Sequence, residues 1–357
     1  MKNFGVLIIT SVFFIQCVGF PARTGGVVET AQVEETVEDT QDEEETPEEN
    51  FYINISRPGT DIPVNEFSEI WAYVIAGREN ALSKGLPLTD IGYFGAEVDS
   101  YGKLTDVPRR QNITFQARIH LVVACNSRSL THFVLMPGRP ERQALIADLI
   151  SSAANYDGLQ IDFEYVPARD GEAYLSFLKE LRERLPKNKA LTVALAARSR
   201  KVADDVYEYE KILPIVDRIL VMAYDEHWSG SSPGSVASLA WCGRVAEYAL
   251  RVIGGEKLVM GVPFYGRAWG DYSPSRALIY NTIATIVNDE RVTDIKYESG
   301  IPTFSYNKNV SIKVYYEDEY SLSSRMEMYK SMGVKSVGFW RLGQETSEIW
   351  KYLKLKK

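Results

Sequence analysis

The sequence predicts a (β/α)₈ barrel, and three observations support this prediction. From about residue 64 onward, short apolar segments alternate with amphipathic stretches, which is typical of parallel β/α units. The roughly 290 residues of this region match the usual size of such a barrel. A doubly wound parallel sheet is the alternative, but the sequence contains no Gly-rich phosphate loop that would favour it.

The predicted strands are eight apolar runs bounded by polar or turn-forming residues. They span residues 70–75, 91–94, 119–124, 158–163, 191–196, 215–223, 258–263 and 336–340. The apolar periodicity predicts helices over residues 144–154, 173–185, 236–252 and 321–332. Residues 270–316 are too many for an ordinary βα connection. We therefore expect a small inserted subdomain between the seventh and eighth strands.

The first 22 residues have the pattern of a signal peptide. Lys2 precedes the apolar run 6–15, and small residues follow it. The run is too short for a comfortable transmembrane span. Cys17 follows the run and is a candidate for lipidation, which would tether the chain to a membrane. The small residues that normally precede a lipidated cysteine are missing, so simple cleavage and secretion is the preferred interpretation.

The following segment, residues 23–60, is predicted to be an acidic disordered tether that leads to a barrel domain at residues 61–357. Its Glu- and Thr-rich part contains almost no aromatic residues, so it cannot bury enough apolar surface to order itself. An interaction tail is the alternative. Together with the signal pattern, this organisation predicts an exported protein that is secreted or held at the cell envelope.

The net charge of −8 is unevenly distributed along the chain. Residues 29–49 account for eleven negative charges, and Lys2 and Arg23 for two positive ones, which leaves +1 for residues 50–357. A nearly neutral body gives no indication of nucleic-acid binding. We expect a monomer.

The cysteines and histidines indicate neither a disulfide framework nor a metal site. Cys125 and Cys242 are the only cysteines after the N-terminal segment, and we expect both to be buried free thiols. His120, His132 and His227 lack the spacing of metal ligands, so we predict no metal and no cofactor.

The most informative stretch is Asp-Gly-Leu-Gln-Ile-Asp-Phe-Glu at residues 157–164. On a β-strand, Gln160, Asp162 and Glu164 share one face, while the apolar residues between them face the helices. Two adjacent carboxylates repel each other and raise the proton affinity of at least one, which keeps a glutamic acid ready to donate a proton. The alternative is a solvated strand face, but a buried strand rarely ends in Asp-x-Glu without a function.

This stretch resembles the Asp-Gly-x-Asp-x-Asp-Trp/Phe-Glu signature of glycoside hydrolase family 18, the chitinase-like enzymes. Asp162 and Glu164 match the signature, whereas Gln160 replaces its middle Asp. The branch that contains bacterial spore-cortex-lytic N-acetylglucosaminidases also has an amide-type residue there, and continues with Asp-Phe-Glu-Tyr, as this chain does through Tyr165.

Three further segments resemble the same family in the expected order, so that the resemblance covers about residues 64–357. Met-Ala-Tyr-Asp at 222–225 resembles the element after the sixth strand, 261–266 resembles the seventh strand, and 336–340 resembles the eighth. Taken singly, Tyr224 and Trp340 would more often belong to a barrel core, and Glu226 and His227 to a polar loop.

The resemblance implies hydrolysis of glycans with β-linked N-acetylglucosamine by substrate-assisted retention. Glu164 would be the general acid and then the base, Asp162 would bind the acetamido N–H, and Tyr224 would donate to the acetamido oxygen. Gln160, Asp225 and Trp340 are predicted to contact the substrate. Peptidoglycan, chitin and N-glycan cores all meet the acetamido requirement. A non-catalytic carbohydrate-binding protein on the same barrel is the main alternative, and a surface-anchored adhesin is a third hypothesis.

Overall fold

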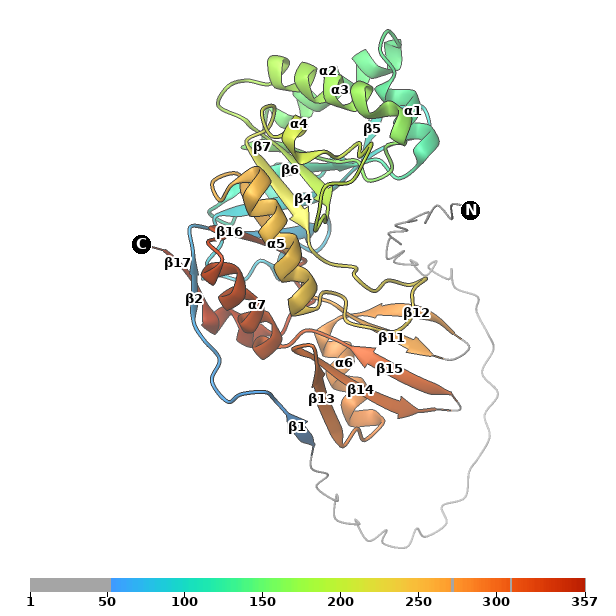
Figure 1. The fold of residues 1–357 in the computed structure, drawn as a ribbon. Helices are drawn as coiled ribbons and strands as arrows, with labels where there is room; N and C mark the ends of the chain where they lie inside the picture. The colour runs from blue at the N-terminus through green and yellow to red at the C-terminus, as the bar shows by residue number, and fades with distance from the viewer. Residues whose placement is uncertain (1–52, 271–272, 309, 357) are drawn as a thin grey trace, which may run out of the picture.

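The computed structural model describes residues 53–270, 273–308 and 310–356, which fold into a closed barrel with an attached subdomain (Figure 1). The predicted signal peptide, Cys17 and the acidic tract up to residue 52 lie outside these residues. In the described part, no helix has the length and apolar character needed to cross a membrane.

Eight parallel strands form the barrel, and each pairs with the next along the chain before the last closes onto the first. They are β3 (Glu69–Ile75), β4 (Asp90–Val98), β6 (Arg118–Ala124), β7 (Gly158–Asp162), β8 (Ala190–Ala196), β9 (Arg218–Met222), β10 (Leu258–Pro263) and β16 (Ser336–Trp340). The predicted (β/α)₈ barrel is confirmed. The sixth strand, β9, is shorter than predicted, because Ile215 and Val216 lie in the preceding turn and Ala223 begins the following loop.

Helices cover the outer face of the barrel along most of its circumference. They are α1 (Arg128–Leu135), α2 (Pro140–Ala153), α3 (Gly171–Arg184), α4 (Tyr209–Ile212), α5 (Leu239–Ile253) and α7 (Glu319–Ser331). The first two connections contain no α-helix within their described residues. They hold the 3₁₀ turns η1 (Glu79–Ala81) and η2 (Arg110–Asn112) and the short strand β5 (Leu104–Thr105), which departs from regular β/α alternation.

Side-chain capping explains where two of the predicted helices begin. Helix α5 begins three residues later than predicted because the Ser238 side chain accepts from the backbone N–H of Trp241. Helix α7 begins with a reciprocal capping box between Asp318 and Ser321. Both helices therefore begin on the side of the barrel where the C-terminal ends of the strands lie.

The barrel wall separates two apolar clusters. Leu159, Ile161 and Phe163 face the helices, as predicted, and Phe163 stacks on Phe177 of α3 with ring centroids 5.7 Å apart. The inner cluster includes the large Trp71 side chain of β3. Gly338 makes room for it, since a Cβ there would lie 2.8 Å from Leu220 and 3.3 Å from Trp71.

The predicted insertion between the seventh and eighth strands is confirmed. It contains β11 (Gly266–Gly270), β12 (Ser273–Leu278), α6 (Tyr280–Asp289), β13 (Asp294–Glu298), β14 (Ile301–Asn307) and β15 (Ser311–Tyr315). Helix α6 packs on this sheet through an apolar cluster of its own. Figure 1 shows the subdomain beside the barrel, near α5 and α7.

The sheet of the insertion also includes a strand from the beginning of the described chain. β1 (Asn54–Ser56) pairs in parallel with β13 at the sheet edge. This strand lies within the range 23–60 that the sequence predicted as tether, so the folded chain starts before residue 61. Near the C-terminus, η4 (Ser347–Tyr352) leads to β17 (Leu353–Leu355), which pairs with β2 (Asn65–Phe67).

Candidate active site

A cavity of about 620 Å³ opens at the C-terminal ends of the barrel strands. Aromatic, apolar and charged residues line it, and they come from β3, β4, β7, β8, β9 and β16, from the loops after these strands, and from the insertion. The lining side chains include Tyr73, Phe94, Asp162, Glu164, Tyr207, Tyr224, Asp225, Trp241, Tyr265, Arg267 and Trp340. Five of the six predicted site residues therefore lie at one cavity, in the position where such barrels usually hold their sites.

Asp162 and Glu164 lie at the end of β7 and face this cavity. The Oδ1 atom of Asp162 is buried and has no hydrogen-bond partner in the described protein. Burial raises the pKa of Asp162 to about 7. Burial, followed by the negative charges of Asp162 and Asp225, raises the pKa of Glu164 well above its ordinary value. The pair therefore retains a proton near neutral pH, which we assign to Glu164 because it faces two other carboxylates.

Gln160 lies beneath the cavity and does not line it. Its side chain is fully buried. The Tyr73 hydroxyl donates to Oε1 of Gln160 at 2.6 Å, and Nε2 of Gln160 donates to Oγ1 of Thr192 at 3.1 Å. This placement does not fit the predicted contact with substrate. Gln160 instead fixes Tyr73, which does line the cavity.

Tyr224 and Asp225 follow β9 and line the same cavity. Gly261 on β10 leaves room for Tyr224, since a Cβ at this position would lie 3.1 Å from the tyrosine ring. Burial raises the pKa of Tyr224 well above its ordinary value, so its hydroxyl remains a proton donor. Asp225 has a φ of 58°, a left-handed conformation that Asp tolerates better than most residues.

The insertion contributes two partners that hold Asp225. The Tyr265 hydroxyl donates to Oδ1 of Asp225 at 2.6 Å, and Nη2 of Arg267 lies 3.5 Å from the same oxygen. Burial raises the pKa of Asp225, while Tyr265 and Arg267 oppose this effect. The subdomain between β10 and β16 is thus part of the site.

Trp340 ends β16 and lies among the aromatic rings of the cavity. Its ring centroid lies 5.4 Å from that of Tyr73 and 5.2 Å from that of Phe94, which it meets edge to face. The flat ring is only partly buried, so it offers an apolar platform beside the two carboxyl groups.

Comparison with known protein families shows which family this chain belongs to. Residues 97–345 match the model of glycosyl hydrolases family 18, and this range includes every predicted site residue. The chain belongs to this family. As a family 18 member it is a glycoside hydrolase, and Asp162 and Glu164 occupy the end of the fourth barrel strand.

Relatives from Bacillus resemble the family 18 chain over most of the barrel. The uncharacterized glycosylase YvbX of Bacillus subtilis (strain 168) is 30% identical over 232 residues, which are 62% of this chain and 67% of that protein. The cortical fragment-lytic enzyme of Bacillus anthracis is 26% identical over 74% of this chain and 67% of its own length.

Solved structures share the fold. The spore cortex-lytic enzyme SleL of Bacillus cereus aligns with a TM-score of 0.74 and 24% identity, covering 84% of this chain and 76% of that one. A chitinase of Chromobacterium violaceum aligns with a TM-score of 0.71 and 21% identity, covering 80% and 97% of the two chains.

Glu226 and His227, which the sequence analysis assigned to a polar loop, make hydrogen bonds within the loop before α5. Oε2 of Glu226 accepts from the Ser238 backbone N–H at 2.8 Å, and Nδ1 of His227 lies 3.1 Å from the Ser232 carbonyl oxygen. Neither lines the cavity. Both side chains therefore stabilise the conformation of the loop that follows Asp225.

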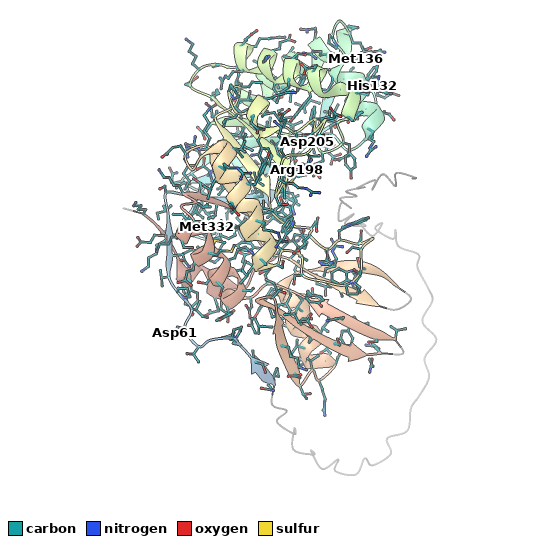
Figure 2. The ribbon with its side chains drawn as sticks, viewed as in Figure 1. Asp61, His132, Met136, Arg198, Asp205 and Met332 are labelled. Atoms are coloured by element: carbon teal, nitrogen blue, oxygen red, sulfur yellow. The ribbon has the colours of Figure 1, made fainter. Side chains whose placement is uncertain are left out.

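Several cavity residues were missed at the sequence level. Tyr73 lies within an apolar strand and could not be distinguished from a core tyrosine. Tyr265 lies in the segment 261–266 that resembles the seventh strand, and Arg267 follows it directly, so this position was the available signal. Arg198, which also lines the cavity, is held by both oxygens of Asp205 at 2.6 and 3.0 Å (Figure 2).

The remaining sequence predictions concern cysteines and metal ions. Cys125 and Cys242 are both buried free thiols, as predicted. Among the described residues, no group of three or more His, Cys, Asp or Glu is arranged to hold a metal ion.

Proposed function

We propose that this chain is an exported glycosidase that hydrolyses glycans containing β-linked N-acetylglucosamine, with peptidoglycan as the first candidate polymer. The observation that supports this proposal is the pair of carboxyl groups, buried Asp162 and partly buried Glu164, in a cavity that also holds the protonated Tyr224. Cortical fragment-lytic enzymes and chitinases among the similar proteins agree with this substrate class. Export rests on the signal pattern of residues 1–22 and remains a prediction.

The first step would be proton donation by Glu164 to the glycosidic oxygen. Desolvation and two neighbouring carboxylates raise the pKa of this group, so that it holds the required proton near neutral pH. As the bond to the leaving group breaks, the carbonyl oxygen of the substrate's own 2-acetamido group would attack the anomeric carbon. The resulting ring carries a positive charge.

Asp162 and Tyr224 would orient the acetamido group for this attack. Oδ1 of Asp162 is buried without a hydrogen-bond partner, so it can accept the acetamido N–H and stabilise the developing positive charge. The Tyr224 hydroxyl would donate to the acetamido oxygen. Asp225 would bind a sugar hydroxyl, and Trp340 would stack under the ring. Glu164, now ionised, would then activate a water molecule that opens the intermediate with retention.

Hydrolysis of aryl β-glycosides of N-acetylglucosamine and its dimer tests the proposal. Glu164→Gln keeps the side-chain volume but removes the acidic proton, so we expect a loss of several powers of ten in kcat/KM. Glu183→Gln, an exposed change on α3, is the matched control and should retain full activity. Aryl glucosides, which lack the acetamido group, should not be cleaved.

A fully active Glu164→Gln enzyme would exclude the assigned acid. Sugar binding without turnover by the wild-type protein would instead support the carbohydrate-binding alternative. In that case the replacement of the family Asp by Gln160 would be the first position to examine.

A further inference from the structure

A second concave surface, of about 540 Å³, lies on the outer side of the catalytic rim. It is bounded by the start of α1 and by the turn η3 (Ala168–Asp170). Its lining residues are Arg128, Ser129, His132, Pro167, Ala168 and Arg169. We call this surface the arginine cleft. Two guanidinium groups line it and no carboxylate does.

The arginine cleft is connected to the catalytic loop. Helix α1 follows β6 and η3 follows β7, so both lie at the strand ends where the cavity opens. Oγ1 of Thr131 on α1 donates to the Tyr165 carbonyl oxygen at 3.2 Å, directly after Glu164. Arg169 follows Glu164 by five residues, which limits their Cα separation to about 18 Å. A glycan chain in the cavity can therefore reach the cleft.

The charges in the arginine cleft are available to a ligand. Arg128 is exposed, and no ion pair joins it to another described residue. The side chain of Arg169 is 73% exposed, with Nε 4.0 Å from Asp170. Asp170 itself is buried, and its carboxylate is engaged by Nδ1 of His132 at 2.8 Å. Figure 2 shows His132 on α1, at the barrel side away from the insertion.

We propose that the arginine cleft binds a carboxylate on the same glycan chain whose N-acetylglucosamine linkage is cleaved in the cavity. This inference rests on the proposed function and narrows its substrate to glycans with carboxylate-bearing hexosamine units. Guanidinium groups form paired hydrogen bonds with carboxylates, and two of them on one concave surface favour an anionic group over a neutral hydroxyl. An uncharged polymer of N-acetylglucosamine offers no such group.

The test compares two soluble oligosaccharides of alternating N-acetylglucosamine and a carboxylate-bearing N-acetylhexosamine, one intact and one with its carboxylates reduced to alcohols. We expect the wild-type KM to be about 3- to 10-fold lower for the intact chain, because exposed ion pairs contribute modestly. Arg128→Gln/Arg169→Gln should remove this difference. Hydrolysis of the aryl N-acetylglucosaminide, which is too short to reach the cleft, should be unchanged.

Arg244→Gln/Arg251→Gln is the control, since it removes the same charge from α5. It should keep the preference for the intact oligosaccharide. About 0.5 M salt should weaken the preference in the wild type. Calorimetry measures the affinity of Glu164→Gln for both oligosaccharides without turnover. It therefore distinguishes a cleft that does not bind the carboxylate from a protein that lacks the proposed activity.

Equal wild-type KM values for the two oligosaccharides would overturn the proposal. It would also be overturned if the cleft variant and the control variant changed the KM difference between the oligosaccharides by the same amount. A preference for a phosphate-bearing glycan over the carboxylate-bearing one would overturn the assigned ligand class.

Discussion

The Tyr73 hydroxyl donates a hydrogen bond of 2.6 Å to Oε1 of Gln160, and both residues lie in the closed interior of the barrel. The side-chain amide N–H of Gln160 in turn donates a hydrogen bond to Oγ1 of Thr192. Side chains from β3, β7 and β8 are therefore linked inside the barrel, although β3 and β7 are not adjacent strands. A carboxylate in place of Gln160 could not donate to Thr192, so the amide is suited to both of its partners.

Gln160→Met should destabilise the protein by about 2–4 kcal/mol, because it leaves two buried hydroxyl groups without their partner. Urea unfolding of wild type and variant measures the difference. Gln143→Met on the exposed face of α2 is the control and should change the free energy of unfolding by less than about 0.5 kcal/mol. If both variants unfolded alike, the buried connection would not contribute to stability.

Gln160 also marks the limit of what the sequence could predict. Its position on the inner face of the strand follows from the two-residue period of Asp-Gly-Leu-Gln-Ile-Asp-Phe-Glu. Its partners do not follow, because Tyr73 lies 87 residues away and belongs to an apolar run. Alternation assigns a face to a side chain, but it does not distinguish a residue under the cavity floor from one that lines the cavity.

The insertion shows a similar limit. Its existence followed from the length of the segment between the last two strands, whereas its use of β1 did not. β1 is three residues long and pairs with a strand 240 positions further along the chain. Short polar segments form strands only where an open sheet edge accepts them, and no local pattern encodes that edge. The same insertion supplies Tyr265 and Arg267 to the site.

The stability of Asp162→Asn relative to the wild type should increase as the pH rises from acidic to neutral values. The pKa of Asp162 is about 7 in the fold and about 3.9 in the unfolded chain. Between these two pKa values, the folded protein binds one more proton at Asp162 than the unfolded chain does. The stability that this proton adds is complete below about pH 4 and is lost as the pH rises to about 7. The asparagine variant lacks this pH-dependent loss.

Unfolding in urea at about pH 4.5 and 7.5 measures this linkage. The stability of Asp162→Asn relative to the wild type should increase between the two values. Asp148→Asn on the exposed face of α2 is the control and should show no such increase. An increase of the same size in both variants would mean that Asp162 is not the group responsible.

Tyr265→Phe should lower kcat/KM for the aryl N-acetylglucosaminide about 10-fold. The hydrogen bond to Oδ1 of Asp225 is short, and bonds to charged groups contribute about 1.5–3 kcal/mol. Without it, Arg267 alone holds Asp225, at 3.5 Å. Tyr248→Phe on α5, whose ring packs on Tyr209 away from the cavity, should leave the rate unchanged. Equal rates for both variants would show that the insertion does not position Asp225 through this bond.

Arg325→Met should be among the most destabilising single changes in the barrel. The Arg325 side chain is fully buried on α7, and its guanidinium group pairs with Glu317 at 2.7 and 3.1 Å. Its Nη2 also donates to the Ala237 carbonyl oxygen at 2.6 Å, in the loop between Asp225 and α5. Removing the arginine leaves the Glu317 carboxylate buried without its partner, which costs about 3–5 kcal/mol.

A double-mutant cycle separates this cost from the value of the pair itself. Arg325→Met/Glu317→Met removes both charges, so it should recover most of the stability lost in Arg325→Met. The free energies of unfolding of the wild type, both single variants and the double variant give the coupling. A double variant whose loss equals the sum of the single losses would contradict the expectation, since the pair would then be energetically independent. Recovery would mean that the cost of Arg325→Met comes from the unpaired buried carboxylate of Glu317, and not from the loss of a net stabilising ion pair.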